Sequence, residues 1–268
     1  GCDIIKTNTF GANPFKFSNL AEIVACAIKN AQKAIQGFSE QKYIALDIGP
    51  LGKMLKPLGD LDFEEAVAAF AQIIKAADQE AIDLILIETM NDAYETKAAV
   101  LAAKENSNLP VFVTNVYDES GKLMTGATPA AMAALLEGLR VDAYGMNCSL
   151  GPRQMKVVAE EMLQYSSLPL IVSPNAGLPR SESGETVYEI DAEEFPELMK
   201  EMVAAGAMIV GGCCGTNPEY IRKTVAKTKQ YPYMAPQKKK DTVVSSYTHT
   251  VTIGQIPVLI GERINPTG

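Results

Sequence analysis

The chain has 268 residues, 47% of them hydrophobic and 21% charged, which is the composition of a globular protein with a large core. Its formal net charge of -8 argues against nucleic acid or an anionic membrane surface as a partner, because both require a basic face. No apolar stretch approaches the roughly 18 residues of a membrane span, and no signal peptide opens the chain. Neither a membrane partner nor secretion is therefore expected.

Five cysteines are present, an odd number without the close, even spacing of a disulfide scaffold. This pattern predicts a reduced, cytoplasmic compartment. Cys2 and Cys26 have no setting that suggests chemistry, and we interpret them as core or surface residues. The other three, Cys148, Cys213 and Cys214, lie at the ends of predicted strands.

Short apolar, β-branched runs alternate with amphipathic segments at a spacing of roughly 30 residues. The first unit is a strand over 3–10 followed by a helix over 19–37. In chain order, the further strands are predicted over 43–50, 84–90, 111–117, 143–148, 170–176 and 208–214. The helices that follow them are predicted over 62–80, 92–106, 129–138, from Pro152 onward, over 193–205 after a long polar loop, and over 218–229.

Seven strand-helix units of this kind predict an α/β fold with a parallel sheet buried on both faces. A closed eight-stranded barrel and an open doubly wound sheet both fit the pattern. We favour the (β/α)8 TIM barrel, because nearly every predicted strand ends in polar or glycine residues, whereas an open sheet concentrates its chemistry at one switch point. Seven units are one short of eight, so the first strand is expected upstream of Gly1.

The periodicity stops after Gln230, which suggests three parts. Residues 1–230 are predicted to be the N-terminally truncated barrel. Residues 231–255 are rich in Pro, Lys, Ser and Thr and are predicted to be a linker. Residues 256–268 include the apolar run PVLIGERIN, and we expect them to begin a second α/β barrel at the C-terminus.

The most specific local motif is the segment MIVGGCCGT, 208–216, in which a predicted short buried strand ends at Cys213 and Cys214, with glycines on both sides. Cys148 also closes a predicted strand, and the strand ends of a parallel barrel meet on one face. Three thiolates favour Zn²⁺, with a fourth position open for substrate or water. Buried cysteines also occur as small hydrophobic residues, and a vicinal disulfide is a strained alternative. The glycines, which let backbone and ligand approach closely, favour the metal site.

A zinc site with three thiolates has a net charge of about -1, and this charge indicates the type of chemistry. Such a metal is a poor Lewis acid for water, but it binds an incoming thiol as a thiolate that still attacks carbon. Alkyl transfer to a thiol is therefore the predicted reaction. A hydrolase would typically use His and carboxylate ligands, and the one histidine, His249, lies in the predicted linker.

Polar side chains at other strand ends are candidates for substrate binding. Glu88 closes the apolar strand LILIETM, where it can bind a substrate ammonium; the alternative is a rim carboxylate paired with a neighbouring Lys or Arg. Each of the remaining residues, taken alone, is interpreted as scaffold, and Asn175 in SPNAG is the strongest candidate among them. They are Asn8, Thr9, Asp47, Asn115, Asn147 and Asn175.

Six short motifs occur in order along the predicted barrel, and they are NTFGAN at 8–13, DIGP at 47–50, ET at 88–89, NCSLGP at 147–152, PNAG at 174–177 and GGCCGT at 211–216. With these motifs the chain resembles the homocysteine S-methyltransferase domain family. The resemblance implies an eight-stranded β/α barrel. It also implies that Cys148, Cys213 and Cys214 bind zinc and that the sulfur of homocysteine takes the open position.

The resemblance further implies that Glu88 binds the amino group of homocysteine and that Asn175 lies beside the metal or binds it transiently. Asn8 and Thr9, from the NTFGAN motif, are additional substrate-binding candidates. The family's first strand carries a DGAxGT-like segment that helps to hold the amino acid, and this segment is not among residues 1–268. Residues 1–268 alone are therefore expected to be destabilised and weakly active.

The C-terminal segment GERINPTG, 261–268, resembles the start of the pterin-binding domain that follows the barrel in cobalamin-dependent members of the family. This implies methyl transfer from methylcobalamin to homocysteine, giving methionine, with methyltetrahydrofolate recharging the cobalamin. The cobalamin-binding and folate-binding modules are expected elsewhere in the same polypeptide. The alternatives are cobalamin-independent transfer from betaine or S-methylmethionine, and a non-catalytic zinc-binding barrel.

Overall fold

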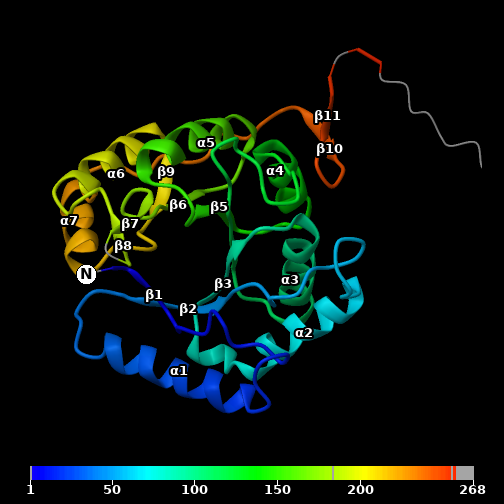
Figure 1. Ribbon diagram of the computed structural model, residues 1–268, viewed down its shortest axis with the longest axis horizontal. Coiled ribbons are helices and arrows are strands. Elements are labelled where there is room, and N and C mark those ends of the chain that lie inside the picture. Colours follow the sequence, from blue (N-terminus) through cyan, green and yellow to red (C-terminus); the bar gives the residue numbers. More distant parts are fainter. Residues whose placement is uncertain (1, 183, 255, 258–268) are drawn as a thin grey trace, which may run out of the picture.

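Seven parallel strands form the central sheet, and helices lie along its outer side (Figure 1). The computed structural model describes residues 2–182, 184–254 and 256–257. The strand order is β1-β2-β3-β4-β5-β6-β9, so each strand pairs with the next one to enter the sheet. These strands are β1 (Ile4–Lys6), β2 (Tyr43–Ile48), β3 (Leu84–Met90), β4 (Val111–Asn115), β5 (Ala143–Asn147), β6 (Leu170–Ser173) and β9 (Ala207–Val210).

A helix lies between each strand of the sheet and the next, as parallel pairing requires. Two helix starts show why the chain turns where it does: Thr128 accepts the Ala131 N–H and Asn217 accepts the Glu219 N–H, each directly before a proline at the first helical position. The helices are α1 (Leu20–Ile35), α2 (Phe63–Ala76), the short 3-10 helix η1 (Gln79–Ala81), α3 (Ala93–Asn106), α4 (Pro129–Gly138), α5 (Pro152–Tyr165), α6 (Glu194–Ala205) and α7 (Pro218–Thr228).

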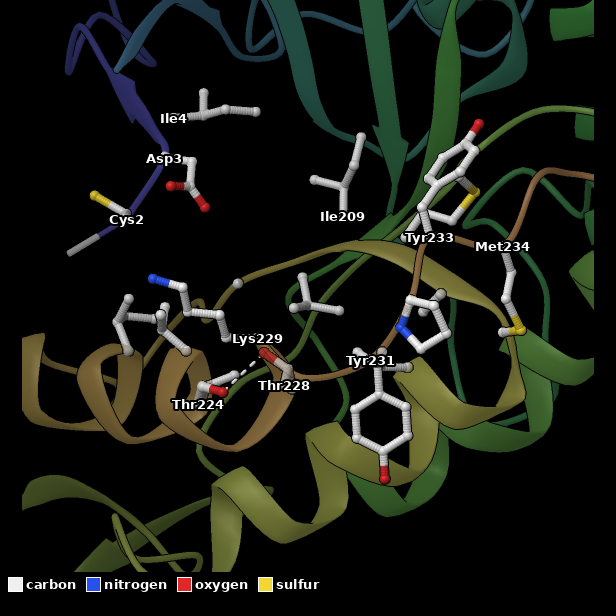
Figure 2. Close-up of a pocket in the computed structure, with 18 of the residues that line it drawn as sticks. Cys2, Asp3, Ile4, Ile209, Thr224, Thr228, Lys229, Tyr231, Tyr233 and Met234 are labelled. Atoms are coloured by element: carbon white, nitrogen blue, oxygen red, sulfur yellow. Dashed lines mark hydrogen bonds between the residues drawn. The ribbon is translucent and has the colours of Figure 1, made fainter. Parts of the chain in front are cut away.

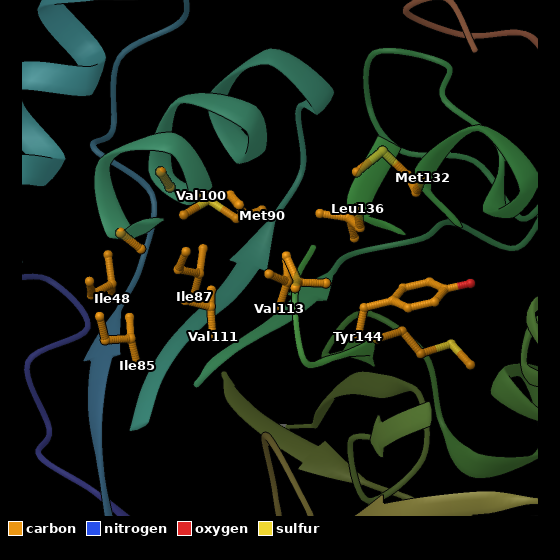
Figure 3. Close-up of a cluster of buried hydrophobic side chains, with 14 of the residues drawn as sticks. Ile48, Ile85, Ile87, Met90, Val100, Val111, Val113, Met132, Leu136 and Tyr144 are labelled. Carbon is orange, nitrogen blue, oxygen red and sulfur yellow. The ribbon is translucent and has the colours of Figure 1, made fainter. Parts of the chain in front are cut away.

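The apolar core lies between the sheet and the helices that cover it. Figure 3 shows part of this core, where side chains of β3 and β4 meet α3 and α4. Ile85 and Ile87 are fully buried there, and the residues that alternate with them, Leu86 and Glu88, point to the opposite, inner face of the sheet. The inner face therefore carries the polar side chains near the carboxyl ends of the strands, where the predicted site lies.

The seven strand-helix units predicted from the pattern are confirmed, with boundaries that differ by a few residues. Two antiparallel hairpins were not predicted. The polar loop before α6 contains β7 (Pro179–Glu182) and β8 (Glu185–Tyr188), and the expected linker contains β10 (Thr242–Ser245) and β11 (Thr250–Ile253). The second hairpin packs on α4, so this part of 231–255 is folded rather than extended. The expected start of a second barrel at 256–268 falls almost entirely outside the described residues.

The described sheet is open between β1 and β9, which are not neighbours in the strand order. A cavity of about 540 Å³ lies at this opening and is lined by both edge strands (Figure 2). Ile4 of β1 and Ile209 of β9 face it from either side, and Tyr231 and Met234 line it after α7. Within the described residues the architecture is thus a parallel seven-stranded half-barrel, consistent with a TIM-like barrel.

None of the helices in the described part of the chain combines the length and apolarity that a bilayer crossing requires.

Candidate functional site

Three cysteines come together at the carboxyl ends of two strands. Cys148 follows β5, while Cys213 and Cys214 follow β9, and β6 lies between these strands in the sheet. Their three sulfur atoms lie within 4.8 Å of one another. The Sγ atom of Cys214 lies 3.8 Å from that of Cys148 and 4.0 Å from that of Cys213. Residues 66 positions apart in the chain therefore form one compact donor set.

The spacing of these sulfurs fits a single zinc ion. A tetrahedral centre with Zn–S bonds of about 2.3 Å places its sulfur ligands about 3.8 Å apart. Two of the sulfur–sulfur separations, 3.8 and 4.0 Å, come close to this value without any movement of the chain. Among the described residues the cluster contains three soft sulfur donors and no further protein ligand, which matches the pattern of a zinc site that keeps one position open.

Backbone hydrogen bonds to the last residue of β6 and to the residue after it hold Cys148 and Cys213 in place. Cys148 donates its N–H to the carbonyl of Ser173 at 3.2 Å, and Cys213 donates to the carbonyl of Pro174 at 2.7 Å. Cys148 and Ser149 both adopt the left-handed conformation, with φ of 61° and 63°. Such a conformation costs a non-glycine residue of order 1 kcal/mol or more and occurs preferentially at functional sites.

Electrostatic coupling among the three thiols favours ionisation of one of them, Cys148. The hydrogen bond from Cys213 lowers the pKa of Cys148 to about 5, although burial opposes this shift. Donating that hydrogen bond, together with burial, raises the pKa of Cys213. Burial and the negative charge of Cys148 raise the pKa of Cys214. A cation bound among the three sulfurs would favour the ionised form of all three thiols, because it stabilises every thiolate at once.

Asn175, the strongest of the predicted strand-end amides, lies against the cysteines. It is 3% exposed, and its Oδ1 accepts the Cys214 N–H at 3.0 Å. A hydrogen bond from Asn175 also contributes to the lowered pKa of Cys148. This buried amide therefore contacts both Cys148, which follows β5, and Cys214, which follows β9.

Asn147 links the cysteines to the end of β3. Its Nδ2 donates to the Thr89 hydroxyl at 2.7 Å and lies 3.8 Å from the Cys213 sulfur, while its Oδ1 accepts the Thr89 N–H at 2.9 Å. Thr89 adopts a left-handed φ of 63°, which is rare for a β-branched residue and is stabilised here by both bonds. Because Thr89 directly follows Glu88, the same contacts fix the position of that carboxylate.

Glu88 is 8% exposed and forms an ion pair with Lys6 on β1. The Lys6 ammonium donates to both carboxylate oxygens, at 2.7 and 3.0 Å. Burial alone would lower the pKa of Lys6, but the charge and hydrogen bonds of Glu88 raise it overall. Asp47 on β2 lies beside this pair, where burial and the charge of Glu88 raise its pKa to about 8. Glu88 thus has the basic neighbour that the alternative interpretation expected, and it also lies on the inner face.

Within the described residues, the side chains of Asn8 and Thr9 form no hydrogen bond with the cysteines. The Thr9 side chain is buried and occupied: its hydroxyl lies 2.6 Å from the Asp47 carbonyl and 2.7 Å from the Thr7 hydroxyl. Asn8 adopts a left-handed φ of 57° and lines a surface cavity beside α1, together with Cys26. Both residues lie in the loop that follows β1, and their role in substrate binding stays a prediction.

Two residues near the site were not singled out from the sequence, Lys6 and Tyr188. Lys6 lies inside a predicted strand, and its pairing with Glu88 depends on the three-dimensional register. Tyr188 ends β8, and a Cβ atom placed on Gly215 would lie 2.4 Å from its ring. The charge of Cys214 contributes, after burial, to a raised pKa of Tyr188. In the sequence, the only signal for the β7–β8 hairpin was this aromatic residue in the polar loop before α6.

Comparison with known proteins places this geometry in a family. A family model described as homocysteine S-methyltransferase matches residues 1–228. The methionine synthases of Mycobacterium leprae (strain TN) and Mycobacterium tuberculosis (strain ATCC 25618 / H37Rv) are 28% and 30% identical to the chain over 290 and 288 residues. Each alignment covers 100% of this chain and 24% of the relative, so the chain spans about a quarter of their length.

Solved structures of the homocysteine methyltransferase MmuM from Escherichia coli, in metallated and oxidised forms, are similar in fold. Both give a TM-score of 0.71 over 85% of this chain and 80% of that chain, at 21% and 22% sequence identity. At this identity the likeness concerns the fold, while the match over residues 1–228 concerns the family. The chain therefore belongs to the homocysteine S-methyltransferase family of enzymes, as its six motifs predicted.

Proposed function

We propose that this chain is the homocysteine-activating module of a larger methyltransferase of the methionine synthase type. The observation that carries the proposal is the cluster of Cys148, Cys213 and Cys214, whose sulfur spacing fits the ligand positions of one zinc ion. Zinc bound there supplies a Lewis acid that keeps the homocysteine thiol deprotonated at neutral pH and still nucleophilic toward a methyl group. The product of the transfer is methionine.

Of the surrounding residues, some position the cysteine thiols and one is proposed to bind the substrate. Asn175 and Asn147 hold the cysteines in place through their amide groups. Glu88 offers a buried carboxylate on the inner face of the sheet, which suits the ammonium of an amino-acid substrate. These contacts orient the sulfur before reaction, and such positioning is a major source of rate enhancement.

The methyl donor is proposed to reach this site on another module of the same polypeptide. The named mycobacterial relatives are about four times as long as the aligned region, which leaves room for further modules. Together with the resemblance of 261–268 to a pterin-binding domain, this favours methylcobalamin as the donor and methyltetrahydrofolate as the source that recharges it. Betaine or S-methylmethionine remains the alternative donor.

The opening between β1 and β9 is proposed to receive the eighth strand of a complete (β/α)8 barrel. Both edge strands offer unpaired backbone groups within the described sheet, and the opening is lined by apolar side chains such as Ile4 and Ile209. A strand placed there would close the sheet and bury these side chains. Polypeptide extended beyond Gly1 should therefore protect the edge amides of β1 and β9 from hydrogen exchange.

Metal analysis tests the first step of the proposed function. Reduced protein should bind one zinc per chain, and Cys148→Ala or Cys213→Ala should lose it. Cys26→Ala is the matched control, because Cys26 is an exposed cysteine on α1, and it should keep the metal. Retention of a full equivalent of zinc by Cys148→Ala would contradict the proposed ligand set.

Methyl transfer tests the second step. Polypeptide extended beyond Gly1, as in the exchange experiment above, should convert homocysteine to methionine with methylcobalamin when it is loaded with zinc, and not after removal of zinc with a chelator. Transfer from S-methylmethionine or betaine, with none from methylcobalamin, would support the alternative donor. Zinc binding without transfer from any of these donors would support a non-catalytic barrel.

A further inference from the structure

In the proposed reaction one zinc ion holds four thiolates, and only the substrate sulfur should receive the methyl group. The other three sulfurs belong to Cys148, Cys213 and Cys214. A thiolate that accepts a hydrogen bond is a weaker nucleophile, because the donor stabilises the charge that would attack carbon. Hydrogen-bond donors at the cysteines can therefore direct methyl transfer to the substrate.

Two of the cysteines have such donors at the neighbouring strand ends. The Asn147 Nδ2 atom lies 3.8 Å from the Cys213 sulfur, within hydrogen-bond reach. At Cys148, the hydrogen bond from Cys213 lowers the pKa most. Hydrogen bonds from the Ser149 N–H and the Asn175 side chain add to that effect. Both amide side chains are almost fully buried, so the surrounding protein fixes their positions.

Cys214 is the exposed member of the cluster, whereas Cys148 and Cys213 are half-buried. Its sulfur is therefore the most accessible of the three to a methyl donor. In the described part of the chain, hydrogen bonds join this sulfur to the other two thiols, at 3.8 and 4.0 Å. Those bonds end when all three cysteines are ionised, because a thiolate has no proton to donate. Cys214 then needs a donor from another side chain.

Tyr188, the last residue of β8, lies in the right place to be this donor. Its ring packs on the backbone next to Cys214, since a Cβ atom added to Gly215 would lie 2.4 Å from the ring. Burial raises the pKa of Tyr188, and the charge of Cys214 and a hydrogen bond with it raise the pKa further. The charges of Cys148 and Cys213 also contribute, so the phenol lies beside all three sulfurs.

Backbone hydrogen bonds tie the base of the β7–β8 hairpin to the loop of Cys214. The Ala176 N–H donates to the Cys214 carbonyl at 2.9 Å, and the Ile190 N–H donates to the Ala176 carbonyl, also at 2.9 Å. Ile190 is 1% exposed, and its carbonyl accepts the Tyr220 hydroxyl at 2.9 Å. Because Ile190 follows Tyr188 by two residues, these bonds keep Tyr188 next to Cys214.

We propose that the Tyr188 hydroxyl donates a hydrogen bond to the zinc-bound sulfur of Cys214 and so protects this cysteine from methylation. Methylation of Cys214 would form a C–S bond, release the leaving group of the donor, and replace a thiolate ligand by a neutral thioether. The inference rests on the proposed function and deepens it, because it explains how the site selects one thiolate among four. Since Tyr188 acts through Cys214, it is a positioning residue.

Methyl iodide tests this selectivity, because so small a donor needs no binding site. Polypeptide extended beyond Gly1 is loaded with zinc and treated with methyl iodide, and fragment mass spectrometry gives the initial methylation rate of each cysteine. Tyr188→Phe keeps the ring on Gly215 and removes the hydroxyl. The Cys214 rate should rise about 10-fold, as expected for the loss of one hydrogen bond to a charged group, while the Cys148 and Cys213 rates stay within about twofold.

Two controls accompany this variant. Cys26, exposed on α1, is an internal reference and should react at the same rate in every variant. Tyr165→Phe removes the hydroxyl of a tyrosine at the end of α5 and should leave the Cys214 rate unchanged. An equal Cys214 rate in the wild type and in Tyr188→Phe overturns the inference. A rise confined to Tyr188→Ala overturns it too, because the ring would then protect the sulfur by its bulk alone.

Cobalt in place of zinc gives a second readout. Without the hydrogen bond the sulfur of Cys214 is easier to oxidise, so the thiolate-to-cobalt charge-transfer band of Tyr188→Phe should move to longer wavelength. An unchanged band overturns the hydrogen bond. If the wild-type protein binds neither metal, the proposed function fails as well; if it binds zinc but Tyr188→Phe matches it in either measurement, only this inference fails.

Discussion

Asn147 and Thr89 hold each other across the sheet by two hydrogen bonds, of 2.9 Å from the Thr89 N–H and 2.7 Å to its hydroxyl. The Oδ1 of Asn147 also accepts the Thr114 hydroxyl at 2.8 Å, so one buried amide connects β3, β4 and β5. Its Nδ2 reaches the Cys213 sulfur at 3.8 Å as well. The left-handed turn at Thr89 and the thiol cluster therefore depend on the same side chain.

Asn147→Ala should lower the free energy of unfolding by about 2–4 kcal/mol, because it leaves the Thr89 N–H and the Thr114 hydroxyl without their acceptor in a buried site. Urea denaturation measures this change. Asn106→Ala is the control: Asn106 donates one part-buried bond to Ala102 at the end of α3, and its loss should cost less than about 1 kcal/mol. Equal effects of the two substitutions would show that Asn147 has no special structural role.

Gly215→Ala should destabilise the site in two separable ways. Gly215 has a φ of 80°, and an added Cβ would lie 2.4 Å from the Tyr188 ring, so we expect a loss of about 2–4 kcal/mol and weaker zinc binding. Gly184 has a similar φ of 84° with nothing within 4 Å of an added Cβ, so Gly184→Ala reports the backbone cost alone, about 1–2 kcal/mol. If both substitutions have the same effect, the contact between Tyr188 and Gly215 does not constrain the hairpin.

Glu95 should make stability depend on pH. Burial raises the pKa of this carboxyl to about 7, although its hydrogen bond with the Leu51 N–H opposes the shift. The unfolded chain releases the proton near pH 4.5 and the folded chain near pH 7, so the free energy of unfolding falls as pH rises between these values. Glu95→Gln should remove this slope and be more stable than the wild type by up to about 3 kcal/mol at pH 8, with little difference at pH 4. Parallel pH profiles of the two proteins would contradict the assignment.

The β10–β11 hairpin should be held to the barrel by Tyr247. Its ring lies 4.4 Å from that of Tyr94, centroid to centroid, and its hydroxyl donates to Asp92 at the start of α3. Tyr247→Ala should raise the hydrogen-exchange rates of the hairpin amides by about tenfold or more, while global stability changes little. Val251→Ala, at a side chain 51% exposed on β11, should leave those rates within about twofold of the wild type. Unchanged exchange in Tyr247→Ala would show that other contacts dock the hairpin.

Much of the fold could be predicted because its strands are buried and its helices amphipathic. The run LILIETM coincides with β3, and the alanine-rich segment 129–138 coincides with α4. The hairpins were missed for two different reasons. The four residues of β7 are all exposed, so no hydrophobic alternation marks the strand. The β-branched residues of β10 and β11 did carry a strand signal, but the surrounding Lys, Pro and Ser favoured a linker interpretation.

The cysteine cluster could be predicted because parallel strands bring their carboxyl ends to one face, whatever the loops between them do. Lys6 and Asp47 could not be assigned in the same way. Their relation to Glu88 depends on the register between three strands, and a shift by one residue would turn each side chain to the other face. The same limit applies to Tyr188, whose position over Gly215 follows from a hairpin with no apolar pattern of its own.

X-ray absorption at the zinc edge tests the central claim most directly. The account predicts that the zinc in the resting protein has three sulfur ligands at about 2.3 Å and that addition of homocysteine increases the number to four. Cys214→Ala should remove one sulfur or the metal itself. A sulfur count that stays the same when homocysteine is added at saturating concentration would contradict the claim that these three cysteines present zinc to the substrate thiol.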